Sequence, residues 1–379
     1  MQLMAKNHKT RVSRRKKSNS EHGSQIRNSG GKQKLKHSED TLSARRPANI
    51  TPAEPQDQNK RAPRLNINAR LPETIPLILE TQSNSEYALL DSGQGRKLER
   101  YGPYIIDRPE AQAFWQCERD NKFWARADAI FDSEKDEEGM GRWKFPHTPL
   151  GETWPLFWNG TQGRLDYHGR FTSFRHVGVF PEQAAHWHFI EDQIGARAKK
   201  SKPPKLLNLF GYTGIASLVA AQAGANVTHV DASKKAIGWA KENQQMAKLQ
   251  DKPIRWICDD AVKFCERELR RNNQYDAIIL DPPKYGRGPK GEVWQLFDSL
   301  PHMIDLCRKL VSDDPVFVIL TSYSIRSSFY AMHELMQETF GDCPGEVQSG
   351  ELILRTLNSK RALSTSLFSR WIASQDKPT

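Results

Sequence analysis

The first indication of a binding site in this sequence is a strand–turn–helix–strand pattern. It contains two glycines in the turn and an acid at the end of the second strand. The apolar run Leu206–Phe210 leads into Gly211-Tyr-Thr-Gly214 and then into a helix-forming segment. A second apolar run starts at Asn226 and ends on Asp231. Glycines let a ligand approach the backbone, and a carboxylate at the next strand end can accept both hydroxyls of a ribose. The pattern predicts a nucleoside pocket, although an ordinary strand-to-helix turn would explain the glycines about equally well.

Two further apolar runs end in ligand-type residues. The run from Ile254 leads into Asp259 and Asp260, where an adenine amino group could be bound, and the run from Tyr275 leads into Asp281-Pro-Pro-Lys-Tyr285. Because the carboxyl ends of parallel strands meet at one edge of a sheet, we expect these residues in a single crevice. The turn is G-x-x-G rather than G-x-G-x-x-G. It therefore suits the amino-acid half of S-adenosylmethionine better than a pyrophosphate.

The chain from about Arg175 to Trp371 resembles the class I S-adenosylmethionine-dependent methyltransferases, of the bacterial group that includes the large-subunit rRNA cytosine methyltransferases. The resemblance covers a little over half of the chain closely, and Tyr87 to Trp154 more loosely. It implies S-adenosylmethionine as the cofactor and RNA, rRNA in particular, as the partner. The segments that carry it are Phe174–Trp187, Leu207–Gly214, Val230–Ser233, Asp259–Ala261 and Asp281–Gly288.

The resemblance also implies roles within the cofactor site. Asp231 would bind the ribose hydroxyls, and Asp260 would accept from the adenine amino group while the Ala261 amide donates to the ring. Asn208 would line the methionine end, and Phe180–Gln183 would cover the cofactor from the opposite side. A helix start is the competing interpretation for both acids and for Phe180–Gln183. The expected cofactor-binding residues are Phe180, Glu182, Gln183, Asn208, Phe210, Gly211, Tyr212, Thr213, Gly214, Asp231, Ala232, Ser233, Asp260, Ala261 and Asp281.

Asp281, Pro282 and Tyr285 are the expected catalytic residues. The prolines fix the loop so that the Asp281 carboxylate and the Pro282 carbonyl can both face an exocyclic amine and aim its lone pair. In N-methyltransferases an aromatic residue directly follows the prolines, whereas here Lys284 intervenes, which also matches the cytosine C5 group. Methylation of carbon 5 requires a cysteine nucleophile, and the segment Leu320–Ile325, where the relatives carry it, has none. We therefore expect a base nitrogen or another non-C5 position as the target.

The net charge of +11 is concentrated near the start of the chain. Residues 1–70 hold 17 Lys and Arg against 5 Asp and Glu, a balance of +12, and the remaining residues hold 39 against 40, a balance of −1. This segment is poor in apolar residues and predicts a disordered basic tail. A phosphate-neutralising arm and a solubilising extension are equally good interpretations. A mitochondrial presequence ranks below both because no apolar helical stripe is present.

Three parts are expected: the basic tail at 1–70, a small β-rich domain at 71–173 and the methyltransferase domain at 174–379. The β-rich part contains Trp115, Trp124, Trp143, Trp154 and Trp158, which favour a core role over base stacking. In the catalytic part, strands and helices alternate until two final strands, Glu351–Arg355 and Ser366–Trp371. The alternation indicates an α/β fold, and the methyltransferase resemblance implies a Rossmann-like seven-stranded sheet with a terminal antiparallel hairpin. The expected helices are Glu182–Ile194, Ile215–Ala223, Lys234–Lys248, Ala261–Arg271, Val293–Lys309 and Ser327–Phe340.

The five scattered cysteines have no C-x-x-C spacing, so neither a disulfide framework nor a zinc site is expected, and the histidines suggest no metal site. No apolar stretch has the length of a membrane span and no signal-peptide core follows the first methionine, so a cytoplasmic location is expected. Two other functional classes remain open. One is a methyltransferase of proteins or small molecules, and the other is a non-catalytic RNA-binding module that retains the cofactor pocket. The target atom and the oligomeric state do not follow from the sequence.

Overall fold

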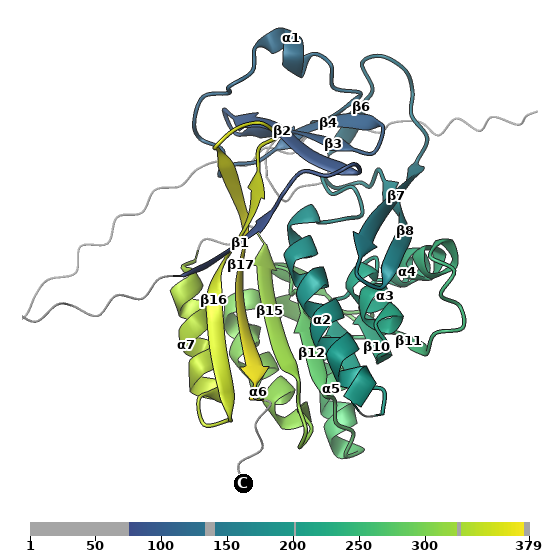
Figure 1. Ribbon diagram of the computed structural model, residues 1–379, viewed down its shortest axis with the longest axis vertical. Coiled ribbons are helices and arrows are strands. Elements are labelled where there is room, and N and C mark those ends of the chain that lie inside the picture. Colours follow the sequence, from purple (N-terminus) through teal and green to yellow (C-terminus); the bar gives the residue numbers. More distant parts are fainter. Residues whose placement is uncertain (1–75, 133–140, 201, 324–326, 375–379) are drawn as a thin grey trace, which may run out of the picture. The chain divides into compact units, whose positions relative to one another are not determined.

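The computed structural model describes residues 76–132, 141–200, 202–323 and 327–374 (Figure 1). The predicted basic tail at 1–70 lies outside the described residues. All described residues belong to one compact unit.

The main sheet has eight strands in the described part of the chain, in the order β1-β16-β17-β15-β12-β9-β10-β11. Strand β17 is antiparallel to both of its neighbours, and the other pairs are parallel. The α/β sheet with a terminal antiparallel hairpin is thus confirmed. The prediction of seven strands missed β1, which extends the edge beside β16. The bounds are β1 Leu77–Thr81, β9 Lys205–Leu209, β10 Asn226–Asp231, β11 Ile254–Cys258, β12 Ala277–Leu280, β15 Phe317–Tyr323, β16 Gly345–Arg355 and β17 Ala362–Ala373.

The central strands are apolar on both faces because helices cover both sides of the sheet. All four residues of β12 are buried. Its Ala277 and Ile279 pack in one core cluster with α2 and α3, whereas Ile278 and Leu280 pack in the other with α5, α6 and α7. Figure 1 shows α2 in front of the sheet. The helices are η1 Pro181–Gln183, α2 Ala184–Lys200, α3 Ile215–Gln222, α4 Lys234–Met246, α5 Ala261–Arg270, α6 Leu296–Leu310 and α7 Phe329–Phe340.

Most helices begin close to the predicted residues because polar side chains cap them. Ser233 caps α4 and Ser328 caps α7, each accepting a hydrogen bond from a backbone amide of the first turn. Helix α6 is the exception. It starts at Leu296 rather than Val293, because Val293–Gln295 forms strand β14, which pairs with β13 at Tyr285–Arg287.

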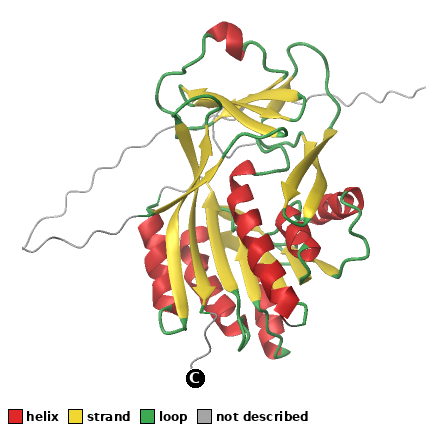
Figure 2. Cartoon of the chain, viewed as in Figure 1, coloured by secondary structure: helices red, strands yellow, loops and turns green. Residues whose placement is uncertain are grey.

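The β-rich part has a five-stranded sheet and a separate hairpin. The sheet follows the order β2-β3-β4-β5-β6, and β7 pairs with β8. The short helix of this part, α1, is drawn in red at the top of Figure 2. Trp154 and Trp158 are buried, and Trp115 and Trp143 pack against the same core, as expected for a structural role. The bounds are β2 Tyr87–Gly93, β3 Arg96–Tyr101, β4 Tyr104–Pro109, α1 Asn121–Trp124, β5 Ala129–Asp132, β6 Arg142–Lys144, β7 Thr153–Gly160 and β8 Gly163–Arg170.

Within the described ranges, every helix is too short or too polar to cross a membrane.

Candidate active site

The loop between β9 and α3 is a tight turn at the carboxyl edge of the main sheet. Phe210, Tyr212 and Gly214 have φ values of 57°, 49° and 80°. L residues rarely adopt this left-handed conformation, which costs about 1–3 kcal/mol for a residue that carries a side chain. Strained turns of this kind concentrate at ligand-binding sites. The strain therefore falls at the point where the sequence predicts the methionine end of the cofactor.

Gly211 is required for close packing rather than for an unusual φ. A Cβ on Gly211 would lie 2.3 Å from Cε1 of His229 and 3.0 Å from Nδ2 of Asn208. Below the loop, Asn208 Nδ2 donates to Ser217 Oγ at 2.9 Å, and Ser217 Oγ lies 3.0 Å from His229 Nδ1. Burial lowers the pKa of His229 to about 3, so its ring is neutral. The Asn208 side chain thus supports the loop from beneath.

Asp231 ends β10 next to this loop. Its Oδ2 accepts a hydrogen bond from the Tyr212 amide at 2.9 Å, and its Oδ1 accepts one from the Ser233 amide at 2.8 Å. A carboxylate oxygen has two lone pairs, so each oxygen retains an acceptor site for a ribose hydroxyl. Burial raises the pKa of Asp231, and the two amide bonds oppose that shift. These acceptor oxygens fit the ribose diol of S-adenosylmethionine.

Asp260 caps a helix at the end of the next strand. Its Oδ1 accepts from the Lys263 amide at 3.0 Å, which makes it the N-cap of α5. The alternative interpretation of Asp260 as a helix cap is therefore correct for its Oδ1 oxygen. Ala261, the first residue of α5, is buried. Ser233 and Ala232 lie between Asp231 and α4, and Ser233 Oγ accepts from the Ala236 amide at 3.2 Å.

Asp281 follows β12 and contacts the segment before α2. Gln183 Nε2 donates to Asp281 Oδ2 at 3.0 Å. Burial and the nearby charge of Glu182 raise the pKa of Asp281 to about 7, while the Gln183 hydrogen bond opposes the shift. Burial also raises the pKa of Glu182. The fold thus brings together a carboxylate that titrates near neutrality and the predicted Phe180–Gln183 segment.

Phe180 contacts both the β9–α3 loop and the end of strand β15. Its ring centroid lies 6.0 Å from Tyr212 of the loop and 5.6 Å from Tyr323 at the end of β15. Thr213 joins the same two segments, because its Oγ1 donates to the Gly178 carbonyl at 2.7 Å. Both contacts hold the segment around Phe180 against the loop.

Pro282 and Tyr285 differ in their surroundings. Pro282 is buried, whereas 52% of Tyr285 is exposed. Tyr285 opens strand β13, which no sequence pattern predicted. Of the three expected catalytic residues, Pro282 is buried, Asp281 is half-buried beside Gln183, and Tyr285 is exposed.

A buried charged network from the β-rich part lies beside these residues and was missed from the sequence. Glu99 accepts hydrogen bonds from Arg108 Nη2 at 3.0 Å and from the Tyr87 hydroxyl at 2.9 Å. Lys97 Nζ lies 3.1 Å from Glu110 Oε2. Burial alone would raise the pKa of Glu99, but Arg108 and Lys97 outweigh it and lower that pKa to about 2.

The buried network contacts the end of strand β15 through Arg175 and Tyr323. Arg108 Nη1 donates to the Arg175 carbonyl at 3.1 Å, and the Arg175 guanidinium lies 5.4 Å from the Tyr323 ring centroid. The sequence offered one signal for this network. Side chains alternate between the two faces of a strand, so Lys97, Glu99 and Tyr101 of Arg96–Tyr101 lie on the same face.

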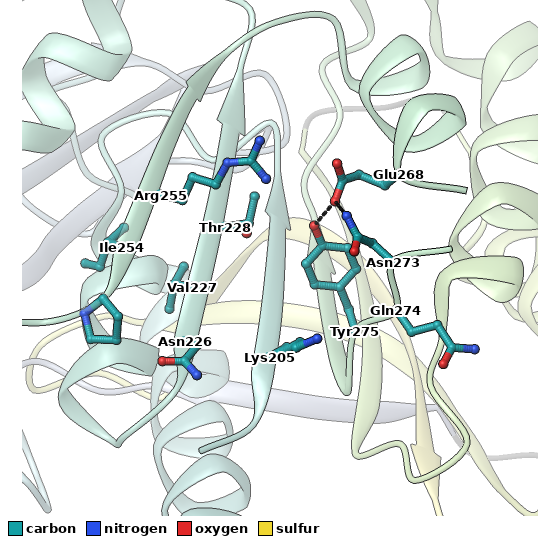
Figure 3. Close-up of a pocket in the computed structure, with 11 residues that line it drawn as sticks. Lys205, Asn226, Val227, Thr228, Ile254, Arg255, Glu268, Asn273, Gln274 and Tyr275 are labelled. Atoms are coloured by element: carbon teal, nitrogen blue, oxygen red, sulfur yellow. Dashed lines mark hydrogen bonds between the residues drawn. The ribbon is translucent and has the colours of Figure 1, made fainter. Parts of the chain in front are cut away.

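A pocket of about 460 Å³ lies at the opposite edge of the main sheet (Figure 3). Lys205, Asn226 and Ile254 line it, and each begins a strand. Glu268 accepts hydrogen bonds from the Tyr275 hydroxyl and from Asn273 Nδ2, both at 2.8 Å (Figure 3). This pocket is remote from Asp231 and Asp281, which lie at the carboxyl ends of their strands.

The described residues include no cluster of His, Cys, Asp or Glu suited to a metal ion.

The fold and the site together define a nucleoside-binding α/β protein of the methyltransferase type, and comparison with solved structures agrees. The S-adenosylmethionine-dependent methyltransferase from Agrobacterium tumefaciens is 56% identical, with a TM-score of 0.74, over 79% of this chain and 95% of that chain. The chain belongs to the family of S-adenosylmethionine-dependent methyltransferases, and S-adenosylmethionine is its cofactor. The structure of SMU.776 complexed with SAH, 16% identical over 76% of each chain with a TM-score of 0.59, shares the fold.

Sequence comparison finds shorter matches. The family described as Conserved hypothetical protein 95 matches residues 193–299. Ribosomal RNA large subunit methyltransferase K/L of Shewanella baltica is 37% identical over 126 residues, which are 32% of this chain and 17% of that protein. The protein of the same name from Pseudoalteromonas atlantica is 33% identical over 189 residues, which are 50% of this chain and 22% of that protein. The chain thus spans about a fifth of the length of these relatives.

Proposed function

We propose that this protein transfers a methyl group from S-adenosylmethionine to ribosomal RNA of the large subunit, at a nitrogen or oxygen atom of a base. An rRNA acceptor places the reaction in the cytoplasm. The acceptor class is supported by the local identity with large-subunit rRNA methyltransferases. The observation that carries the proposal is the Asp281 carboxylate, held by Gln183 at the sheet edge that also carries Asp231.

We assign the role of each residue in the reaction from the position of its side chain. Asp231 and the loop around Gly211 bind and orient the cofactor, and the segment around Phe180 excludes water from the other side. When bound, S-adenosylmethionine supplies an electrophilic methyl group on a sulfonium. Asp281 and the Pro282 carbonyl accept the hydrogens of the target amine, which directs the nitrogen lone pair toward the methyl carbon.

The proton released in this reaction has a natural acceptor. Transfer of the methyl group would leave the bonding electron pair on the departing sulfur, and the amine would have to lose one proton to become neutral. A carboxylate with a pKa near 7 can take that proton at neutral pH and return it to solvent. The half-buried position of Asp281 therefore suits both orientation and proton transfer.

The cysteines argue against carbon 5 of cytosine as the target. All five cysteines lie in the described part of the chain. Cys265 in α5 and Cys307 in α6 are fully buried in the core, and burial raises the pKa of Cys307 to about 12. Cys258 pairs with Asp231 in register, on the far side of the sheet from β15. These positions support our expectation that Cys258, Cys265 and Cys307 do not add to carbon 6 of a base held at Asp281.

A transfer assay with purified protein tests the acceptor. The full-length protein, radiolabelled S-adenosylmethionine and rRNA from cells lacking the gene should give labelled RNA. Asp281→Ala should slow the transfer by about 10²-fold or more, the scale for losing one positioned polar group. Absence of label in RNA with the wild-type protein would reject the RNA acceptor.

The methylated atom has its own test. With rRNA that contains 5-fluorocytosine, a carbon-5 enzyme is trapped as a covalent complex through its cysteine. We expect no such complex, and Cys258→Ser should transfer methyl groups at the wild-type rate. A trapped complex that disappears in a cysteine variant would restore carbon 5 as the target.

A further inference from the structure

We infer that the outer face of the β13–β14 ribbon binds the single-stranded RNA next to the target base, by stacking on Tyr285 and by contact of Arg287 with phosphate. The inference rests on the proposed RNA acceptor and extends it to a surface outside the pocket.

The register of the ribbon assigns its side chains to two faces. Tyr285 pairs with Gln295, Gly286 with Trp294, and Arg287 with Val293. Because side chains alternate along a strand and directly opposed residues share a face, Tyr285, Arg287 and Val293 lie together on one side. Gly286 and Trp294 occupy the other side.

The inner face fixes the ribbon onto the cofactor loop. Trp294 is buried, its Nε1 donates to the Pro283 carbonyl at 2.7 Å, and its ring lies 4.9 Å from that of Phe210. The Leu296 amide donates to the Lys284 carbonyl at 3.0 Å and joins the end of the ribbon to its start. The ribbon is therefore a rigid extension of the site.

The outer face has the composition of a nucleic-acid surface. Tyr285 is 52% exposed and Val293 is 55% exposed, and Phe297, which follows the ribbon, is 59% exposed. Arg287 and Lys290 are exposed as well, whereas the acid of the turn, Glu292, pairs with Lys263 Nζ at 2.6 Å. Aromatic side chains interspersed with cations bind single-stranded nucleic acid by stacking and phosphate contact.

The position of this face selects RNA as the occupant. Tyr285 is only four residues beyond Asp281, so a nucleotide chain whose base reaches Asp281 must leave the pocket near the ribbon. The excess of positive charge beside exposed apolar side chains matches a phosphodiester chain better than an apolar protein surface.

Binding of a fluorescein-labelled single-stranded RNA of about 12 nucleotides to the full-length protein tests the inference. Tyr285→Ala should weaken binding by about 5- to 150-fold, which corresponds to the ~1–3 kcal/mol of one stacked base. Arg287→Ala should weaken binding and lower the salt slope of log K by about one. Phe114→Ala removes an exposed aromatic outside the ribbon and serves as the matched control, with wild-type affinity expected.

The outcomes separate this inference from the proposed function. If the wild-type protein binds and methylates RNA but Tyr285→Ala and Arg287→Ala bind it equally well, the ribbon surface is rejected alone. If the wild-type protein neither binds nor methylates RNA, the RNA acceptor is rejected as well. If Tyr285→Ala instead changes the oligomeric state in sedimentation and leaves RNA affinity intact, the ribbon is a protein interface and the inference is wrong.

Discussion

At the scale of single residues, Asp231 links the cofactor loop to the start of α4 through two amide hydrogen bonds. Replacement by Ala removes both bonds and the proposed ribose acceptor. We expect Asp231→Ala to weaken S-adenosylmethionine binding by about 10²-fold, since a buried acceptor of this kind contributes about 2–3 kcal/mol. Isothermal titration calorimetry measures the change, with exposed Asp251→Ala as the control. Wild-type affinity in a folded Asp231→Ala protein would remove Asp231 from the cofactor site.

The raised pKa of Asp281 gives methyl transfer a defined pH dependence. Because the ionised carboxylate is the form that accepts the target hydrogens, kcat/KM should rise with pH through about 7 and then level off. The Gln183 hydrogen bond favours the ionised form, so Gln183→Ala should raise the pKa and move the midpoint to higher pH. Initial rates measured from about pH 5 to pH 9 test both statements. A flat profile, or a midpoint that moves to lower pH in Gln183→Ala, would contradict the role of Asp281.

At the scale of elements, the β9–α3 turn depends on the space that Gly211 leaves above His229. Gly211→Ala would place a Cβ 2.3 Å from the imidazole, so the loop or the ring must shift. Overpacking of this kind costs about 1–3 kcal/mol, and urea denaturation should show that loss. Gly238→Ala is the matched control, because a Cβ there meets nothing within 4 Å and Ala favours the α4 helix by up to about 1 kcal/mol. Equal stability of Gly211→Ala and the wild type would show that the turn is not tightly packed.

The elements that could be predicted from the sequence are those with local signals. The continuous apolar runs of the parallel strands and the capping residues of α4 and α5 mark their own positions. Strand β1 escaped prediction because it is an edge strand that pairs with β16, far along the chain. Strand β13 also escaped because Gly286, Gly288 and Gly291 make its segment resemble a loop, and strand β14 was wrongly included in the helix predicted from Val293.

The site residues that could be proposed from the sequence were likewise those with a local sequence signal. Asp231, Asp260 and Asp281 could be proposed as site residues because each lies at the end of a recognisable strand or shortly after it. Lys97 and Glu99 could not, because charged residues on a strand normally face water. Alternation shows that Lys97 and Glu99 share a strand face, but their burial against Glu110 and Arg108 depends on tertiary contacts.

At the scale of the whole molecule, the charge is divided unevenly along the chain, with +12 in residues 1–70 and −1 in the rest. If the tail neutralises phosphates, its deletion should weaken RNA binding and flatten the dependence of log K on log salt, while S-adenosylmethionine binding stays unchanged. Fluorescence anisotropy across a salt series, with calorimetry for the cofactor, measures both properties. Equal salt slopes for the full-length and truncated proteins would show that the tail is no phosphate arm.

The central claim is that this methyltransferase acts on rRNA, and mass spectrometry of rRNA nucleosides tests it most directly. Large-subunit rRNA from cells with and without the gene is digested and compared, with a strain expressing Asp281→Ala as the catalytic control. We expect one methylated nucleoside, modified on nitrogen or oxygen, to disappear on deletion, to return with the wild-type gene and to stay absent with Asp281→Ala. An identical set of methylated nucleosides in all strains would contradict the proposal.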